Sequence, residues 1–219
     1  MKLERMDAFF NARVEIYDDH MLQNVDGARL FYTETAKLFP REGRLSVLDL
    51  GVGTGLELAA LWERNPLIHV TGVDLSAGML EKLREKYPER KEQLTLIQGD
   101  YFAVDFGTER FDAALSVESL HHFSHEAKRS LYRRLRESLK PGGFYVETDY
   151  IARSQAEEDA LFAEAARLRG EQGISGGYYH YDTPCTVETQ KKLLLAAGFS
   201  RVELLWQSQY TVILRAESL

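Results

Sequence analysis

The sequence predicts an α/β protein with a doubly wound, seven-stranded and mostly parallel sheet, a C-terminal antiparallel hairpin and an N-terminal helical cover. Two observations carry this prediction. Apolar runs without breakers alternate with stretches of helical periodicity between residues 45 and 150, a pattern typical of parallel strands joined by crossover helices. The first run leads directly into glycines at positions 51, 53 and 55 and then into a helix start. Such a strand–turn–helix unit binds ligands in open α/β sheets.

The remaining elements follow in order within a single expected domain. The helical cover occupies residues 1–40, the core 45–150, a variable substrate region 151–198 and the closing hairpin 199–219. Period-2 patterns and apolar runs predict strands at 47–50, 68–74, 94–98, 111–117, 144–149, 201–206 and 209–215. Helical periodicity predicts helices at 56–64, 77–87, 125–139, 152–169 and 186–197, besides a helical stretch over 4–39 that breaks at Asp26–Gly27. The turn at 140–143 is expected to end a helix before the fifth strand.

Composition limits the classes of protein. The chain has 219 residues, of which 44% are hydrophobic, enough for one domain with a full core. The net charge of −7 argues against a general nucleic-acid binder. Cys185 is the only cysteine, which excludes a disulfide framework. Early charges and the lack of a long apolar run indicate neither a signal peptide nor a membrane span, so a cytoplasmic protein is expected.

The glycine spacing decides between ligand classes. In the dinucleotide fingerprint G-x-G-x-x-G, the third glycine would fall at position 56, which is Leu56. A phosphate-binding P-loop is excluded as well, because no Gly-Lys-Ser/Thr follows the turn. The motif over residues 49–55 instead resembles the first motif of class I S-adenosylmethionine-dependent methyltransferases, with Asp49 followed by Gly51, Gly53 and Gly55. The resemblance is close over about 45–144, and implies a Rossmann-like methyltransferase fold and S-adenosylmethionine as cofactor, with S-adenosylhomocysteine as product.

Two acids at strand ends extend this resemblance. Asp74 ends the second strand, where a carboxylate holds a ribose hydroxyl pair; the alternative is that it caps the next helix. The resemblance assigns Asp74, Leu75 and Met79 to the adenosyl ribose segment. It also assigns Asp100 to the adenine amino group and Tyr101 to the adenine ring. Ser116 and Val117, at the carboxyl end of the fourth strand, complete the expected cofactor site.

Candidate catalytic residues follow the fourth strand. His121 and His122 resemble the Leu-His-His-aromatic segment of many small-molecule members, and with Glu118 they lie where a proton acceptor would sit. Either histidine could instead be a helix-start residue bonded to backbone. A metal site of His121, His122 and His125 is a further alternative, which no ligand pattern supports, so no metal is expected. The basic residues of the next helix, among them Lys128 and Arg134, read as a solvated face.

Two segments outside the scaffold are rich in aromatics and are expected to close the site. One is the N-terminal helical region, where Tyr17 is the expected cofactor contact. The other is 178–182, where His180 or Tyr181 is the expected substrate contact. The predicted function is methyl transfer from S-adenosylmethionine to a small molecule. The alternatives are a sensor or non-methylating enzyme that binds this cofactor, an RNA or protein methyltransferase and, weakened by Leu56, an NAD-dependent oxidoreductase. The sequence does not indicate the oligomeric state.

Overall fold

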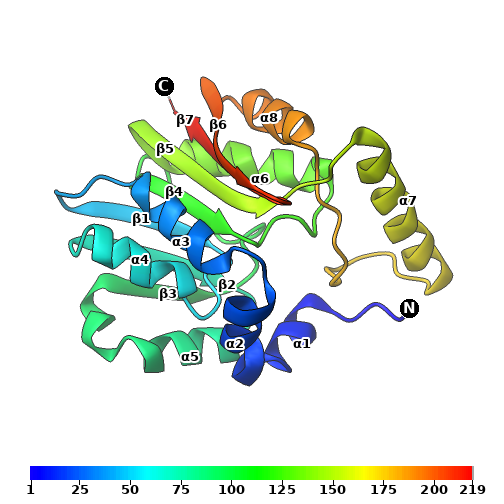
Figure 1. Ribbon diagram of the computed structural model, residues 1–219, viewed down its shortest axis with the longest axis horizontal. Coiled ribbons are helices and arrows are strands. Elements are labelled where there is room, and N and C mark those ends of the chain that lie inside the picture. The colour runs from blue at the N-terminus through cyan, green and yellow to red at the C-terminus, as the bar shows by residue number, and fades with distance from the viewer. Residues whose placement is uncertain (219) are drawn as a thin grey trace.

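The computed structural model describes residues 1–218 and contains one seven-stranded sheet in the order β3-β2-β1-β4-β5-β7-β6 (Figure 1). The strands are β1 Leu45–Leu50, β2 Ile68–Asp74, β3 Leu94–Gln98, β4 Phe111–Val117, β5 Leu139–Tyr150, β6 Arg201–Ser208 and β7 Thr211–Glu217. The first five strands pair in parallel, whereas β7 is antiparallel to both β5 and β6. The predicted mostly parallel sheet with a closing antiparallel hairpin is therefore confirmed.

The helices connect these strands and cover the N-terminal side. They are α1 Met6–Asn11, α2 Val14–Asn24, α3 Ala28–Lys37, α4 Leu56–Arg64, α5 Ala77–Lys86, α6 His125–Ser138, α7 Gln155–Glu171 and α8 Val187–Ala196, with a 3₁₀ helix at Pro88–Gln93. The predicted helical stretch 4–39 is thus three helices. The break between α2 and α3 is the one expected at Asp26–Gly27, because Gly27 takes φ 75° and caps the start of α3. None of the helices described in residues 1–218 is long and apolar enough to cross a bilayer.

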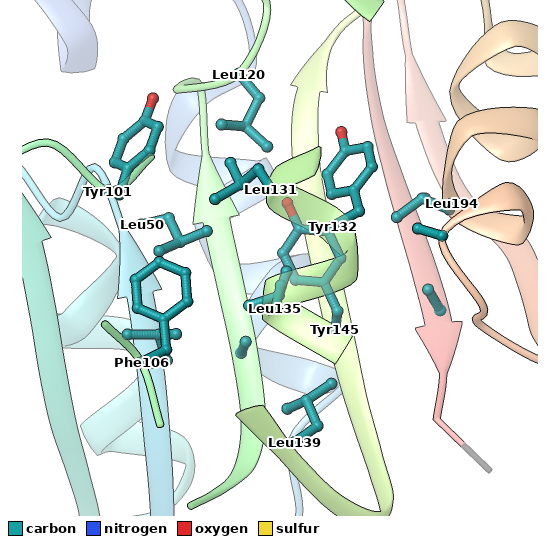
Figure 2. Close-up of a cluster of buried hydrophobic side chains, with 14 of the residues drawn as sticks. Leu50, Tyr101, Phe106, Leu120, Leu131, Tyr132, Leu135, Leu139, Tyr145 and Leu194 are labelled. Carbon is teal, nitrogen blue, oxygen red and sulfur yellow. The ribbon is translucent and has the colours of Figure 1, made fainter. Parts of the chain in front are cut away.

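Both faces of the central strands β1, β4 and β5 are buried, as the uninterrupted apolar runs predicted. On one face, α3, α4 and α5 pack over Val47 and Val70. On the other face, α6 and α8 cover Leu48 and Leu50. Figure 2 shows this second cluster, in which the side chains of α6 lie against the strands. Alternate residues of β1 thus belong to opposite clusters, so the strand is buried on both faces.

The turn at 140–143 differs from the expectation. Helix α6 ends at Ser138, and Leu139 pairs at once with Phe111 of β4. The chain then passes through an irregular segment, in which Gly142 takes φ 76°, before regular pairing resumes at Phe144. The fifth strand therefore begins five residues earlier than the regular stretch 144–149, because a bulge can be accommodated at the sheet's amino-terminal edge.

The parallel topology brings the functional loops to one edge. The loops that follow β1, β2, β3 and β4 all leave from the carboxyl ends of neighbouring strands. Helices α1 and α2 lie at this end of the sheet (Figure 1). They contact α5, and Arg5 forms a β-bridge with Tyr179 from the loop before α8. The cover and the strand ends therefore enclose a common space.

Candidate functional site

The three glycines of the loop after β1 differ in what a side chain at each position would contact. All three take positive φ, at 76°, 51° and 70° for Gly51, Gly53 and Gly55, a region where glycine has no steric penalty. A Cβ on Gly51 would overlap the Ser119 side chain, and one on Gly55 would lie 3.0 Å from Leu58 and from Leu83. A Cβ on Gly53 would meet only the Gly51 carbonyl oxygen, at 3.9 Å, among the described atoms. Gly53 is therefore the position at which the loop is open to a ligand.

Asp74 at the end of β2 holds this loop in place. Its Oδ2 accepts a hydrogen bond from Gly53 N at 2.9 Å, and its Oδ1 accepts one from Ser76 N at 2.8 Å. The cap of α5 is Ser76, whose hydroxyl accepts from Met79 N at 3.1 Å. Asp74 is thus not the side-chain cap considered as the alternative. Burial raises the pKa of its carboxyl group, which the two backbone donors partly offset.

A cavity of about 50 Å³ lies beside the loop. We call it the glycine-loop cavity; its lining is Met6, Phe10, Tyr17, Gly51, Gly53, Asp74, Leu75, Met79, Tyr101, Glu118, Ser119, His122 and Phe123. Most of the expected cofactor residues are in this set. Tyr101 is positioned by its hydroxyl, which lies 3.3 Å from both Ser119 O and Ser119 Oγ. Of the other cover residues in this lining, Phe10 belongs to the aromatic N-terminal segment expected to close the site, whereas the sequence did not point to Met6.

Five expected cofactor residues lie outside the lining of this cavity, namely Asp49, Gly55, Asp100, Ser116 and Val117. Asp49 is buried beneath the loop, and burial and the nearby carboxylate of Glu57 raise its pKa well above the ordinary value. Asp100 accepts from Phe102 N at 2.8 Å, and the Ser116 hydroxyl lies 2.6 Å from that of Tyr145. Their contact with a cofactor stays a prediction.

A second and larger cavity, of about 350 Å³, adjoins the first. We call it the histidine cavity; its lining is Phe9, Phe10, Arg13, Ile16, Tyr17, His20, Met21, Val25, Glu118, His121, His122, Tyr150, His180 and Asp182. Phe10, Tyr17, Glu118 and His122 line both cavities. Tyr17, expected in the cover, thus stands between them. His180 lines the histidine cavity, whereas Tyr181 lines other surface hollows.

The two adjacent histidines have opposite electrostatic environments. His121 is buried, which lowers its pKa, but Nδ1 lies 2.5 Å from Asp149 Oδ1, and this and other carboxylates raise the pKa to about 9. Asp149 is itself fixed by Leu120 N, which donates to Oδ2 at 2.9 Å. His122 Nδ1 lies 3.1 Å from Asp182 Oδ1. Burial and the charge on His121 nevertheless lower the pKa of His122 to about 4. At neutral pH the first imidazole is therefore charged and the second neutral.

Glu118 is strained and incompletely bonded. It takes φ 49°, which is uncommon for a residue other than glycine. Its side chain is only 4% exposed, and its Oε2 has no hydrogen-bond partner within residues 1–218. Burial, reinforced by Asp149, raises the pKa of this carboxyl group to about 8. The sequence placed Glu118 near the site. Its backbone strain and its position in the wall between the two cavities are visible only in the structure.

The two expected cover segments contact each other directly. Met6 N donates to Tyr178 O at 3.0 Å, and His180 N donates to Glu4 O at 2.9 Å. The ring of Phe9 stacks on that of His180 with 3.5 Å between centroids. His125, by contrast, lies 2.9 Å from Glu158 through Nε2, so the structure does not group it with His121 and His122. The N-terminal helical region and the loop before α8 are therefore joined into one cover.

Comparison with known proteins agrees with this geometry. Residues 47–143 match a family described as a methyltransferase domain. The chain is 30% identical over 172 residues to a carboxy-S-adenosyl-L-methionine synthase of Pseudomonas fluorescens, covering 70% of this chain and 68% of the relative. A synthase of the same name from Wolinella succinogenes is 26% identical, with 90% and 88% covered.

Among solved structures, phosphoethanolamine N-methyltransferase 2 of Haemonchus contortus in complex with S-adenosyl-L-methionine superposes with a TM-score of 0.69 at 19% identity. The match covers 95% of this chain but 57% of that one. At this identity the likeness shows the fold alone.

Proposed function

The chain belongs to the class I S-adenosylmethionine-dependent methyltransferases, and we propose that it transfers the cofactor's methyl group to a small molecule in the histidine cavity. One observation supports the second part of this proposal. The two cavities share a wall of Phe10, Tyr17, Glu118 and His122. An acceptor in the histidine cavity would therefore lie beside the ligand of the glycine loop, as direct transfer requires.

The residue types of the glycine-loop cavity fit the cofactor. We propose that the backbone at Gly53 approaches it, that Asp74 accepts from the ribose hydroxyls and that Tyr101 lies against the adenine ring. The cavity of about 50 Å³ is smaller than the roughly 300–1,000 Å³ of ordinary ligand sites. We propose that Phe10 and Tyr17, which line both cavities, move aside on binding. The cofactor, when bound, supplies an electrophilic methyl group.

This chain's own residues would orient the acceptor and exclude water from it. The aromatic side chains of Phe9, Phe10 and Tyr17 cover the cavity and would separate the reacting groups from bulk solvent. His121 and His122 are the proposed catalytic residues, because both line the histidine cavity and His122 also faces the cofactor side. Asp149 fixes the ring of His121 in one orientation.

Cofactor binding is tested with two glycine variants. Gly53→Ala puts a methyl group into the open space beside the loop, whereas Gly142→Ala has an equally unfavourable positive φ but no described atom within 4 Å. Both variants should lose similar stability, about 1 kcal/mol each. Only Gly53→Ala should lose affinity for S-adenosylhomocysteine in calorimetry, and wild type should not bind NAD. Equal affinity for the two variants, or tight NAD binding, contradicts the proposed site.

A second candidate function is chemistry on the cofactor without methyl transfer. The observation that favours it is the similarity to carboxy-S-adenosyl-L-methionine synthases over most of the chain. Cofactor labelled in the methyl group separates the two functions. Under our first proposal, the label leaves the cofactor and appears in a small acceptor from a metabolite extract. Label retained in a modified cofactor supports the second candidate instead.

A further inference from the structure

We propose that His121, His122 and Asp182 form a binding site for a divalent transition-metal ion in the wall of the histidine cavity. Two imidazoles and one carboxylate are a donor set that binds zinc and its neighbours, with coordination positions left open. From the sequence no metal is expected, and the alternative weighed there has His125 as its third ligand, which the structure places against Glu158. Asp182 comes from the loop before α8 and was not identifiable as a neighbour from its spacing.

The ligand atoms already have nearly the required spacing. One atom from each of the three side chains lies within 4.8 Å of the other two. Asp182 Oδ1 is 3.1 Å from His122 Nδ1 and 3.7 Å from His121 Nε2. An ion held at about 2.1 Å from each ligand needs ligand atoms roughly 3.0 to 3.5 Å apart, for octahedral or tetrahedral angles. The separation between Asp182 and His122 is therefore already in this range and that between Asp182 and His121 is close to it, whereas the two imidazoles, whose ligand atoms lie within 4.8 Å of each other, must approach as the ion binds.

The surroundings of His121 are those of a metal ligand. Its Nδ1 is bonded to Asp149, at 2.5 Å, and the Nε2 on the opposite side of the ring points to Asp182. When an incoming ion displaces the Nε2 proton of the charged ring, Nδ1 keeps its hydrogen toward Asp149 and the Nε2 lone pair binds the cation. A carboxylate on the far nitrogen is the usual support for a metal-bound imidazole. Asp149 is held in turn by Leu120 N, so the ring is fixed before any ion arrives.

The cavity gives an ion access to the site. Its lining contains the carboxylate of Asp182 and the carboxyl group of Glu118, with the guanidinium of Arg13. Asp182 is 53% exposed and lines the cavity, so an ion could enter without unfolding the core. The side of the ion that faces the cavity would be free for oxygen ligands, either water or an acceptor. The acceptor's role as a ligand rests on the proposed function, whereas binding of the ion does not.

Cobalt(II) is the probe, because its visible absorption reports its ligands. We expect metal-stripped wild-type protein to bind one Co²⁺ per chain, with new absorption bands that Zn²⁺ abolishes by displacement. Asp182→Asn and His122→Gln should each weaken binding at least tenfold. Asp149→Asn, which leaves the three ligands in place, should weaken it by about 10- to 100-fold. Circular dichroism establishes that each variant is folded, and Asp182, being half-exposed, is the variant least able to disturb the core.

Two matched histidine variants serve as controls. His125→Gln removes a ligand from a second possible cluster, with Glu158 and Cys185, and His69→Gln removes an exposed histidine on β2. Both should bind Co²⁺ as wild type does. Absence of binding in wild type overturns the proposal, as does unchanged affinity in Asp182→Asn and His122→Gln. Loss of binding in His125→Gln alone would assign the ion to the other cluster. All of these outcomes are independent of cofactor binding and turnover.

Discussion

At the scale of single residues, the site depends on side chains that hold the backbone as well as face the ligand. Asp74 is the main example, because its two oxygens accept from Gly53 N and Ser76 N while its carboxylate lines the glycine-loop cavity. A carboxylate oxygen has further lone pairs, so these bonds leave it able to accept from ligand hydroxyls. The residue therefore couples the shape of the loop to ligand binding.

Asp74→Ala should weaken the binding of S-adenosylhomocysteine by roughly 2 to 4 kcal/mol, because two charge-assisted hydrogen bonds are lost. Calorimetry measures the loss directly. The control is Asp112→Ala. Asp112 Oδ2 accepts a hydrogen bond from the backbone N–H of Ser46 at 2.8 Å, so this variant also removes a backbone acceptor, but at the opposite edge of the sheet. That variant should lose stability and keep its affinity. Equal affinity for wild type and Asp74→Ala would contradict a ribose contact.

At the scale of elements, the cover is joined both within itself and to the carboxyl-terminal edge of the sheet. Helix α1 and the loop 178–182 share backbone hydrogen bonds and the Phe9–His180 stack. The bond between Ser76 Oγ and Asn11 Oδ1, at 2.7 Å, attaches α1 to the start of α5, beside Asp74. A ligand that orders the loop around Asp74 should therefore also order the cover.

Hydrogen exchange tests this coupling. Binding of S-adenosylhomocysteine should increase protection over residues 9–22 and 176–183 as well as over 51–55, because the cover closes over the ligand. Helix α3 is the internal control, since its buried face packs in the core and its protection should not change. If only 51–55 responds, the cover does not close on the cofactor, and a large acceptor bound at an open edge becomes the better explanation.

At the scale of the whole molecule, buried carboxyl groups make stability depend on pH. Glu57 is 6% exposed and packs near Asp49 beneath the glycine loop. Burial raises its pKa from 4.5 to about 7. Between these two pH values, the folded protein therefore keeps a proton on Glu57 that the unfolded chain has released. The contribution of Glu57 to the stability of the fold is fully present below pH 4.5 and is lost as the pH rises through 7.

Glu57→Gln should remove this dependence, because the amide stays neutral at every pH. We expect the variant to be more stable than wild type at pH 8, by up to about 3 kcal/mol, and close to wild type near pH 5. Denaturant unfolding at both pH values measures the difference. Glu63→Gln is the control, on the same helix but exposed, and should behave as wild type does. A gain that does not grow with pH would show that Glu57 is ionised in the folded protein.

The sequence by itself determined the sheet and the place of its cofactor loop. Apolar strands and glycine turns are local signals, because burial on both faces requires unbroken apolar runs and positive φ strongly favours glycine. The resemblance at 49–55, together with its continuation over about 45–144, identified the family and the cofactor. It also directed attention to Asp74 and Tyr101, which do line the glycine-loop cavity.

Tertiary structure decided what the side chains face, since that depends on elements distant in the chain. Lys128, expected on a solvated helix face, is buried with Nζ 3.3 Å from Gln190, and Arg134 donates to the carbonyl oxygens of Tyr101 and Phe102. Glu118 is strained at the wall between two cavities. Asp182 meets His121 and His122 across about 60 residues of chain. No local pattern encodes such a contact, because the loop before α8 is positioned by its bonds to α1, at the other end of the sequence.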